Sequence, residues 1–206
     1  MGLRERKKRQ TRELISGVAT EMFVQRGFDL VTVAEVAAAA GVSEKTVFNY
    51  FPRKEDLFLD RLPELLALTT EAVRNRPEGT SVLAAFRGVV FDLLAAGHPL
   101  SAYPGRGHAG FYRVVVGSPA LQARVREFQQ ELEDLLVELA RESSGRGGGE
   151  GELRLRLAAA VTVAAYRTVY FRAAARVLAG EDPVAVGETL FAEYAETFAA
   201  AEKALS

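Results

Sequence analysis

Residues 41–51, GVSEKTVFNYF, place four side chains that can form hydrogen bonds within six positions of one another. They are Lys45, Thr46, Asn49 and Tyr50. If this stretch is helical, at about 100° per residue, Lys45 and Asn49 share one outward face. An α-helix fits the major groove of DNA, where asparagine can pair with adenine and lysine with guanine. The chemistry that these residue types could do is therefore the reading of base edges.

Two short helices with a tight turn between them would hold this face in place. The first is predicted over Thr32–Ala40, because Thr32 and Glu35 have the spacing of a capping box. Gly41 ends that helix, and a second helix runs from Ser43 to the residue before Pro52. This is helix-turn-helix spacing, with Val47, Phe48 and Phe51 predicted to pack inward. The alternative is an ordinary surface helix, whose exposed face is also polar.

Other residues near this helix are predicted to reach phosphate groups. They are Ser43, Thr46, Tyr50 and Lys54. Residues 1–54 hold 10 Lys or Arg and 6 Asp or Glu, whereas the rest of the chain holds 16 and 21. A cluster of five basic residues within positions 4–9 forms a basic N-terminal arm, which indicates a polyanionic partner for one end of the chain. A solvated, disordered terminus is the alternative.

Helical periodicity continues along nearly the whole chain and predicts an all-α fold of roughly nine helices. Residues 12–26 form the first, and a long helix from Arg53 or Lys54 into the 70s is interrupted by Pro63. FYRVVV (111–116) has β propensity, but a lone strand would have no partner, so we expect a short helix or coil. SSGRGGGEG (143–151) is predicted to be a flexible connector.

Residues 10–60 resemble the N-terminal domain of the TetR family of transcriptional regulators. The resemblance is carried by TVAEVAAAAGVSEKTVFNYFPRKEDLF (32–58) and by MFVQRGFD (22–29). It implies that seven residues lie at DNA-contacting positions: Thr32, Ser43, Lys45, Thr46, Asn49, Tyr50 and Lys54. Position 48 is commonly tyrosine in that family and is Phe here, which removes a hydroxyl group and suggests a packing role.

The resemblance also implies two domains with different functions. Residues 1–53 would be a helix-turn-helix DNA-binding domain with its basic arm, and residues 54–206 a helical ligand-binding and dimerisation domain. The expected protein is a ligand-responsive regulator, a repressor on family grounds, that binds a palindromic double-stranded DNA operator as a homodimer. A small-molecule effector of unknown identity is the second expected partner. The rival hypothesis is a helical small-molecule carrier or enzyme without sequence-specific DNA binding.

Aromatic residues of the C-terminal part, with one arginine, are the candidates for contact with an effector. They are Phe86, Phe111, Tyr112, Tyr166, Arg167 and Tyr170. Arg167 lies among apolar residues on its helix, so its charge needs a partner, either a carboxylate such as Asp92 or an anionic ligand. The aromatic residues could instead be ordinary core.

The last two helices, predicted over about 153–178 and from Pro183 to about Lys203, are the expected dimer interface. The last has an apolar stripe that includes Phe191 and Phe198, together with alanines that allow close approach. Burial within one subunit is the alternative to a dimer.

Several function classes have little support in the sequence. There is no cysteine, which excludes disulfides and thiolate metal sites. GRGHAG (105–110) matches a dinucleotide-binding pattern, but no strand precedes it, so a loop is expected. The two histidines, His98 and His108, do not suggest a metal site, and neither an enzyme nor a cofactor is expected. The longest apolar run is too short to span a membrane, so a cytoplasmic protein is expected.

Overall fold

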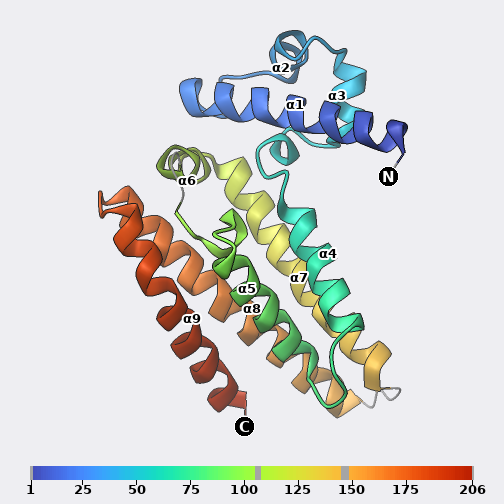
Figure 1. Cartoon of the computed structure of the whole chain (residues 1–206), viewed down its shortest axis with the longest axis vertical. Helices are drawn as coiled ribbons and strands as arrows, with labels where there is room; N and C mark the ends of the chain where they lie inside the picture. The colour runs from blue at the N-terminus through green and yellow to red at the C-terminus, as the bar shows by residue number, and fades with distance from the viewer. Residues whose placement is uncertain (1, 105–107, 145–148, 206) are drawn as a thin grey trace. The chain divides into compact units, whose positions relative to one another are not determined.

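The computed structural model describes residues 2–104, 108–144 and 149–205, and these residues are helical with no strand among them (Figure 1). The all-α prediction is confirmed, and the described residues form nine α-helices and two 3₁₀ helices. These elements are α1 (Leu3–Arg26), α2 (Val33–Ala39), α3 (Glu44–Tyr50), η1 (Glu55–Leu57), α4 (Leu62–Arg74), α5 (Val82–Ala95), η2 (Pro99–Ser101), α6 (His108–Gly117), α7 (Pro119–Ser144), α8 (Gly149–Leu178) and α9 (Pro183–Leu205).

The chain divides into two compact units. The first comprises residues 1–60 and 110–125, and the second comprises residues 61–109 and 126–206. The sequence predicts a boundary at 53/54, whereas the first unit continues to Asp60 and also includes most of α6 and the start of α7. FYRVVV lies in α6, so the prediction of a short helix or coil there is confirmed as helix.

The first unit is built around aromatic residues from distant parts of its sequence. The ring centroids of Phe23 and Phe28 lie 4.9 Å apart, and Phe58 meets Phe23 edge-on at 5.7 Å. Phe111 of α6 stacks on Phe58 at 4.7 Å. Gly27 ends α1 with φ at +89°, which allows the chain to turn and place Phe28 against the helix that it has just left.

Two helix boundaries differ from the predictions. The basic N-terminal arm is a helical extension, because α1 begins at Leu3 and not at Arg12. The predicted long helix from Lys54 is wrong: η1 and a turn follow α3, and α4 begins at Leu62. Pro63 therefore lies in the first turn of α4, where its missing N–H costs nothing, and it interrupts no helix.

In the second unit, α8 packs against α9, and α5 contacts α4, α8 and α9 (Figure 1). Two buried tyrosines direct their hydroxyl groups to the backbone of η2. Tyr166 donates to the carbonyl of Leu100 at 2.5 Å, and Tyr194 donates to the carbonyl of Ser101 at 3.2 Å. Because buried hydroxyl groups need partners, these bonds fix η2 against α8 and α9.

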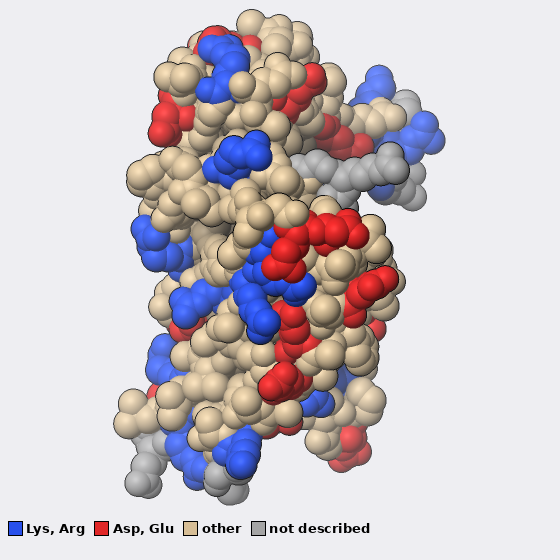
Figure 2. Space-filling view, turned by 90° about the vertical axis from the view of Figure 1, so that its left-hand side faces the viewer, with Lys and Arg blue, Asp and Glu red and all other residues tan. Residues whose placement is uncertain are grey.

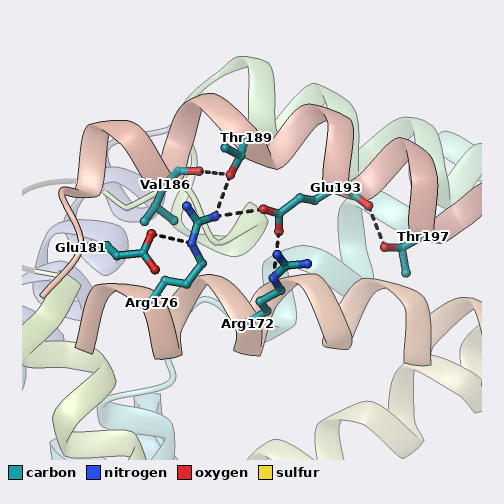
Figure 3. A network of polar contacts seen from close by, with 7 residues as sticks. All are labelled: Arg172, Arg176, Glu181, Val186, Thr189, Glu193 and Thr197. Atoms are coloured by element: carbon teal, nitrogen blue, oxygen red, sulfur yellow. Dashed lines mark hydrogen bonds and ion pairs between the residues drawn. The ribbon is translucent and has the colours of Figure 1, made fainter. Parts of the chain in front are cut away.

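Helices α8 and α9 are joined by a polar network as well as by apolar packing (Figure 3). The guanidinium of Arg176 on α8 donates to Glu181 at 2.8 Å, to the hydroxyl of Thr189 at 2.8 Å and to Glu193 at 2.9 Å. Arg172, one turn earlier, lies 3.9 Å from the other carboxylate oxygen of Glu193. The side chains of Arg176 and Glu193 are mostly buried, so this network fixes the register of the two helices.

Charges of both signs are interleaved on the face of the molecule drawn in Figure 2, in keeping with a formal net charge of −1. Among the described residues, none of the helices combines the length and apolarity that crossing a membrane requires.

Candidate DNA-binding surface

Side-chain caps fix where α2 and α3 begin. The hydroxyl of Thr32 accepts from the backbone N–H of Glu35 at 3.2 Å, and the carboxylate of Glu35 accepts from the N–H of Thr32 at 2.8 Å, so the predicted capping box is present. At α3, the hydroxyl of Ser43 accepts from the N–H of Thr46 at 3.1 Å. Gly41, with φ at +68°, forms the turn between the two helices.

The residues of α3 divide into a buried and an exposed face as the sequence predicts, except for Phe48. Val47 and Phe51 are each 1% exposed and face the core, whereas Lys45 and Asn49 are exposed. Phe48 is 46% exposed, so the prediction that it packs inward with Val47 is wrong. One residue beyond Val47 is about 100° around the helix, which carries the ring of Phe48 past the edge of the buried face.

Arg12 of α1 holds the C-terminal end of α3. Its guanidinium donates to the backbone carbonyl of Tyr50 at 2.9 Å and to that of Asp60 at 3.2 Å. The same group lies 4.3 Å from the centre of the Phe51 ring, a cation–π distance. Pro52 ends α3 early and leaves its last carbonyls without helical partners, so an external donor is needed there. The sequence alone gives no sign of this role for Arg12, because its partners lie 38 and 48 positions away.

Lys54 is held inside the first unit. Its ammonium group donates to the carbonyl of Phe28 at 2.6 Å and lies 4.3 Å from the centre of the Phe28 ring. Burial lowers the pKa of Lys54, and the carboxylates of Asp29, Glu55 and Glu35 offset part of that effect. A phosphate contact by Lys54 stays a prediction, and it would require the ammonium group to share or leave this carbonyl.

The basic N-terminal end of α1 and the end of α3 border a shallow, open groove. Its lining residues are Arg4, Glu5, Lys7, Lys8, Thr11 and Tyr50. Arg4, Lys8 and Thr11 follow one another at intervals of three and four residues, so they lie on one side of the helix. The extension thus presents positive charge beside Tyr50, one of the residues predicted to contact phosphate.

The predicted effector-binding residues do not all come together. Phe86, Tyr166 and Tyr170 form a cluster in the second unit, with ring centroids 5.8 Å apart for Phe86 and Tyr166 and 6.0 Å apart for Tyr166 and Tyr170. Phe111 and Tyr112 belong to the first unit. Their role in effector binding stays a prediction, and the two groups are described separately.

Arg167 does not lie in an apolar environment, contrary to the expectation from its helix. The residue is exposed, and its guanidinium donates to the amide oxygen of Gln129 on α7 at 3.5 Å. Its charge also lowers the pKa of Glu133, although burial dominates and raises that pKa overall. The requirement for a buried partner such as Asp92 therefore disappears, since water solvates the charge.

The first unit also matches a known family. Residues 15–60 match the family model described as bacterial regulatory proteins, tetR family. The HTH-type transcriptional regulator TcmR of Streptomyces glaucescens is 31% identical over 146 residues, which are 70% of this chain and 65% of TcmR. The match thus spans just under two thirds of that relative. Residues 15–60 are therefore similar to the DNA-binding domain of the TetR family.

Further relatives extend the comparison to a larger part of the chain. The nucleoid occlusion factor SlmA of Pasteurella multocida is 29% identical over 155 residues, 70% of this chain and 72% of SlmA. Native NalD, the secondary repressor of the MexAB-OprM efflux pump in Pseudomonas aeruginosa, has a TM-score of 0.53 at 20% identity, covering 93% of this chain and 96% of NalD. A TetR-family regulator from Streptomyces coelicolor has a TM-score of 0.52 at 22% identity, covering 91% and 94%. The two structures share the fold of this chain, and TcmR is a transcriptional regulator.

Glu35 makes the stability of the α2 start dependent on pH. Its carboxylate accepts from the backbone of Thr32 and pairs with Arg26 at 2.7 Å, and these bonds lower its pKa from about 4.5 to about 2. A lowered carboxyl pKa contributes stability above the unfolded-state pKa, and that contribution is lost as the pH falls towards the folded-state value. We therefore expect Glu35→Gln to lower the melting temperature at pH 7. The difference in melting temperature between this variant and wild type should shrink as the pH falls from about 4.5 to about 2.

Thermal unfolding followed by circular dichroism across this pH range measures the effect. Glu21→Gln, at an exposed glutamate on α1, is the matched control and should follow wild type. A constant difference between Glu35→Gln and wild type from pH 7 to pH 2 would contradict the assignment.

Proposed function

We propose that this protein is a transcriptional repressor that binds a palindromic DNA operator as a homodimer and releases it in response to a small-molecule effector. The observation that carries the proposal is the outward face of α3, which exposes Lys45 and Asn49 directly opposite the buried Val47 and Phe51. Similarity to the TetR family supports the same conclusion.

The chemistry of the first unit suggests how the contacts divide. Lys45 would donate to guanine acceptors, and Asn49 would pair in a bidentate manner with adenine. Ser43, Thr46 and Tyr50 would contact phosphates, and Thr32 would do so from the exposed N-terminal end of α2. The basic extension of α1 would add charge contacts that depend on salt but not on base sequence.

A seam of exposed and partly exposed residues on α8 supports dimerisation. Its residues are spaced alternately four and three apart, as contact residues are between two packed helices. They are at positions 157, 161, 164, 168, 171, 175 and 178. Leu157, Phe171 and Leu178 leave large apolar surfaces exposed along it. Phe198 of α9, by contrast, is 3% exposed and packs within its own subunit, so it does not contribute to this seam. The Arg176–Glu193 network would keep α8 and α9 together as one rigid pair.

An effector would act through the second unit, near the aromatic cluster of Phe86, Tyr166 and Tyr170. A dimer places two α3 helices at a fixed separation, and half-sites on DNA repeat at fixed intervals. A ligand that favours a different separation would therefore weaken operator binding. By linkage the operator would weaken ligand binding by the same factor.

Selection of duplexes from a random-sequence library, followed by titration of the enriched palindrome, tests the DNA-reading role. We expect Asn49→Ala to lose about 1–3 kcal/mol of discrimination at one base position in each half-site, while binding to scrambled duplex is unchanged. Asn75→Ala, at an exposed asparagine after α4, is the matched control. Equal weakening of cognate and scrambled duplexes by Asn49→Ala would show that Asn49 does not read a base.

Sedimentation velocity at micromolar concentration tests the dimer. We expect Phe171→Glu to give monomers, because a charge in the centre of a buried helix seam lacks a partner. Val116→Glu is the control, since Val116 is an apolar residue of α6, outside α8 and α9, and is 55% exposed. A wild-type monomer, or a Phe171→Glu protein as dimeric as wild type, would refute the interface.

A further inference from the structure

Phe48 is an aromatic residue on the outward side of α3, among groups that can form hydrogen bonds. The α3 helix has seven residues and uses Val47 and Phe51, each 1% exposed, for its contact with the core. Phe48 is less buried than either, and 46% of the residue remains exposed and available to a partner. A phenyl ring also offers no hydrogen-bond donor for a phosphate or for a base edge.

The position of Phe48 on the helix gives its exposed ring a defined neighbourhood. It follows Lys45 by three residues, so the two side chains are neighbours on the helix surface, with Cβ atoms about 5–6 Å apart. Asn49 is the next residue, and Thr46 and Tyr50 lie on the other flank of the same face. Single exposed apolar residues are common on protein surfaces. This one lies beside the two side chains assigned to base reading.

The major groove of B-DNA carries one apolar group, the C5 methyl of thymine. We propose that Phe48 recognises a thymine methyl group in each operator half-site and is a specificity-determining residue of α3. This inference rests on the proposed DNA-binding function and deepens it. The spacing of about 5–6 Å from Lys45 corresponds to roughly two base-pair steps of 3.4 Å, so the thymine should lie within about two pairs of the guanine that Lys45 contacts.

Uracil differs from thymine only by the methyl group, so substituted duplexes isolate the contact. The probe is the palindrome that wild-type protein enriches from a random duplex library, resynthesised with uracil for thymine at one position per half-site at a time. We expect uracil to lower the affinity at one thymine position in each half-site, by roughly fourfold for each methyl group removed. Substitution of the other thymines should leave the affinity unchanged.

Variants of Phe48 assign that effect to the ring. Phe48→Ala should bind the unmodified palindrome more weakly and should lose the difference between thymine and uracil at that position. Phe48→Tyr keeps the ring and should keep the difference. Phe191→Ala, a control at an exposed phenylalanine of the second unit, should retain the full difference. Circular dichroism confirms that each variant is folded, which is expected because the residue is half exposed.

The outcomes separate this inference from the proposed function. An enriched palindrome that tolerates uracil at every thymine position overturns the role of Phe48 and leaves the repressor proposal standing. A uracil effect that persists undiminished in Phe48→Ala also overturns it, because another group then recognises the methyl. Failure of wild-type protein to enrich any sequence overturns the proposed function, and with it the inference that depends on it.

Discussion

A helix of seven residues cannot hold its own shape in water, and the proposed DNA-binding surface depends on one such helix, α3. Its N-terminal end is fixed locally by Ser43, but Pro52 cuts it off before its last carbonyls find helical partners. Arg12 of α1 supplies the missing donor to Tyr50 and stacks on Phe51. One side chain thus gives a carbonyl at the end of α3 its hydrogen-bond donor and joins this end to α1.

Lys54 is a second cation that makes a hydrogen bond inside the first unit. Lys54 follows α3 and binds the carbonyl of Phe28, which lies just after α1. Arg12 and Lys54 therefore link the chain around α3 to α1 and to the segment that directly follows α1. Lys45, Phe48 and Asn49, the residues that we propose contact bases, take no part in these links. Lys54, which the sequence predicts to contact phosphate, thus also helps to position α3 within the fold.

The sequence predicts the local features of this structure well. Thr32, Glu35 and Ser43 cap their helices as expected, and Gly41 has the positive φ that the turn requires. These features depend on residues three or four positions apart, so their spacing is visible in the sequence. The all-helical class follows from apolar periodicity for the same reason.

The features that sequence could not predict depend on contacts between distant residues. Lys54 and Phe28 are 26 positions apart, and nothing near either residue marks the bond between them. Phe48 lies at the edge of the buried face of α3, where the rotation of 100° per residue cannot show whether a side chain is packed or exposed. Arg167 seemed buried because its sequence neighbours are apolar, yet it points outward beside Gln129. The spacing of apolar residues shows which side of a helix is buried but does not give the position of every flanking side chain.

The central claim is that α3 enters the major groove with Lys45 at a guanine. Dimethyl sulfate methylates guanine N7, which faces the major groove, so protection from it measures this contact on the palindrome that the wild-type protein selects. The account predicts protected guanines in both half-sites, centred one or more helical turns of about 10–10.5 base pairs apart, and loss of that protection in Lys45→Ala at protein concentrations that still saturate the DNA. Saturated DNA whose guanine N7 atoms remain as reactive as in free duplex would contradict it.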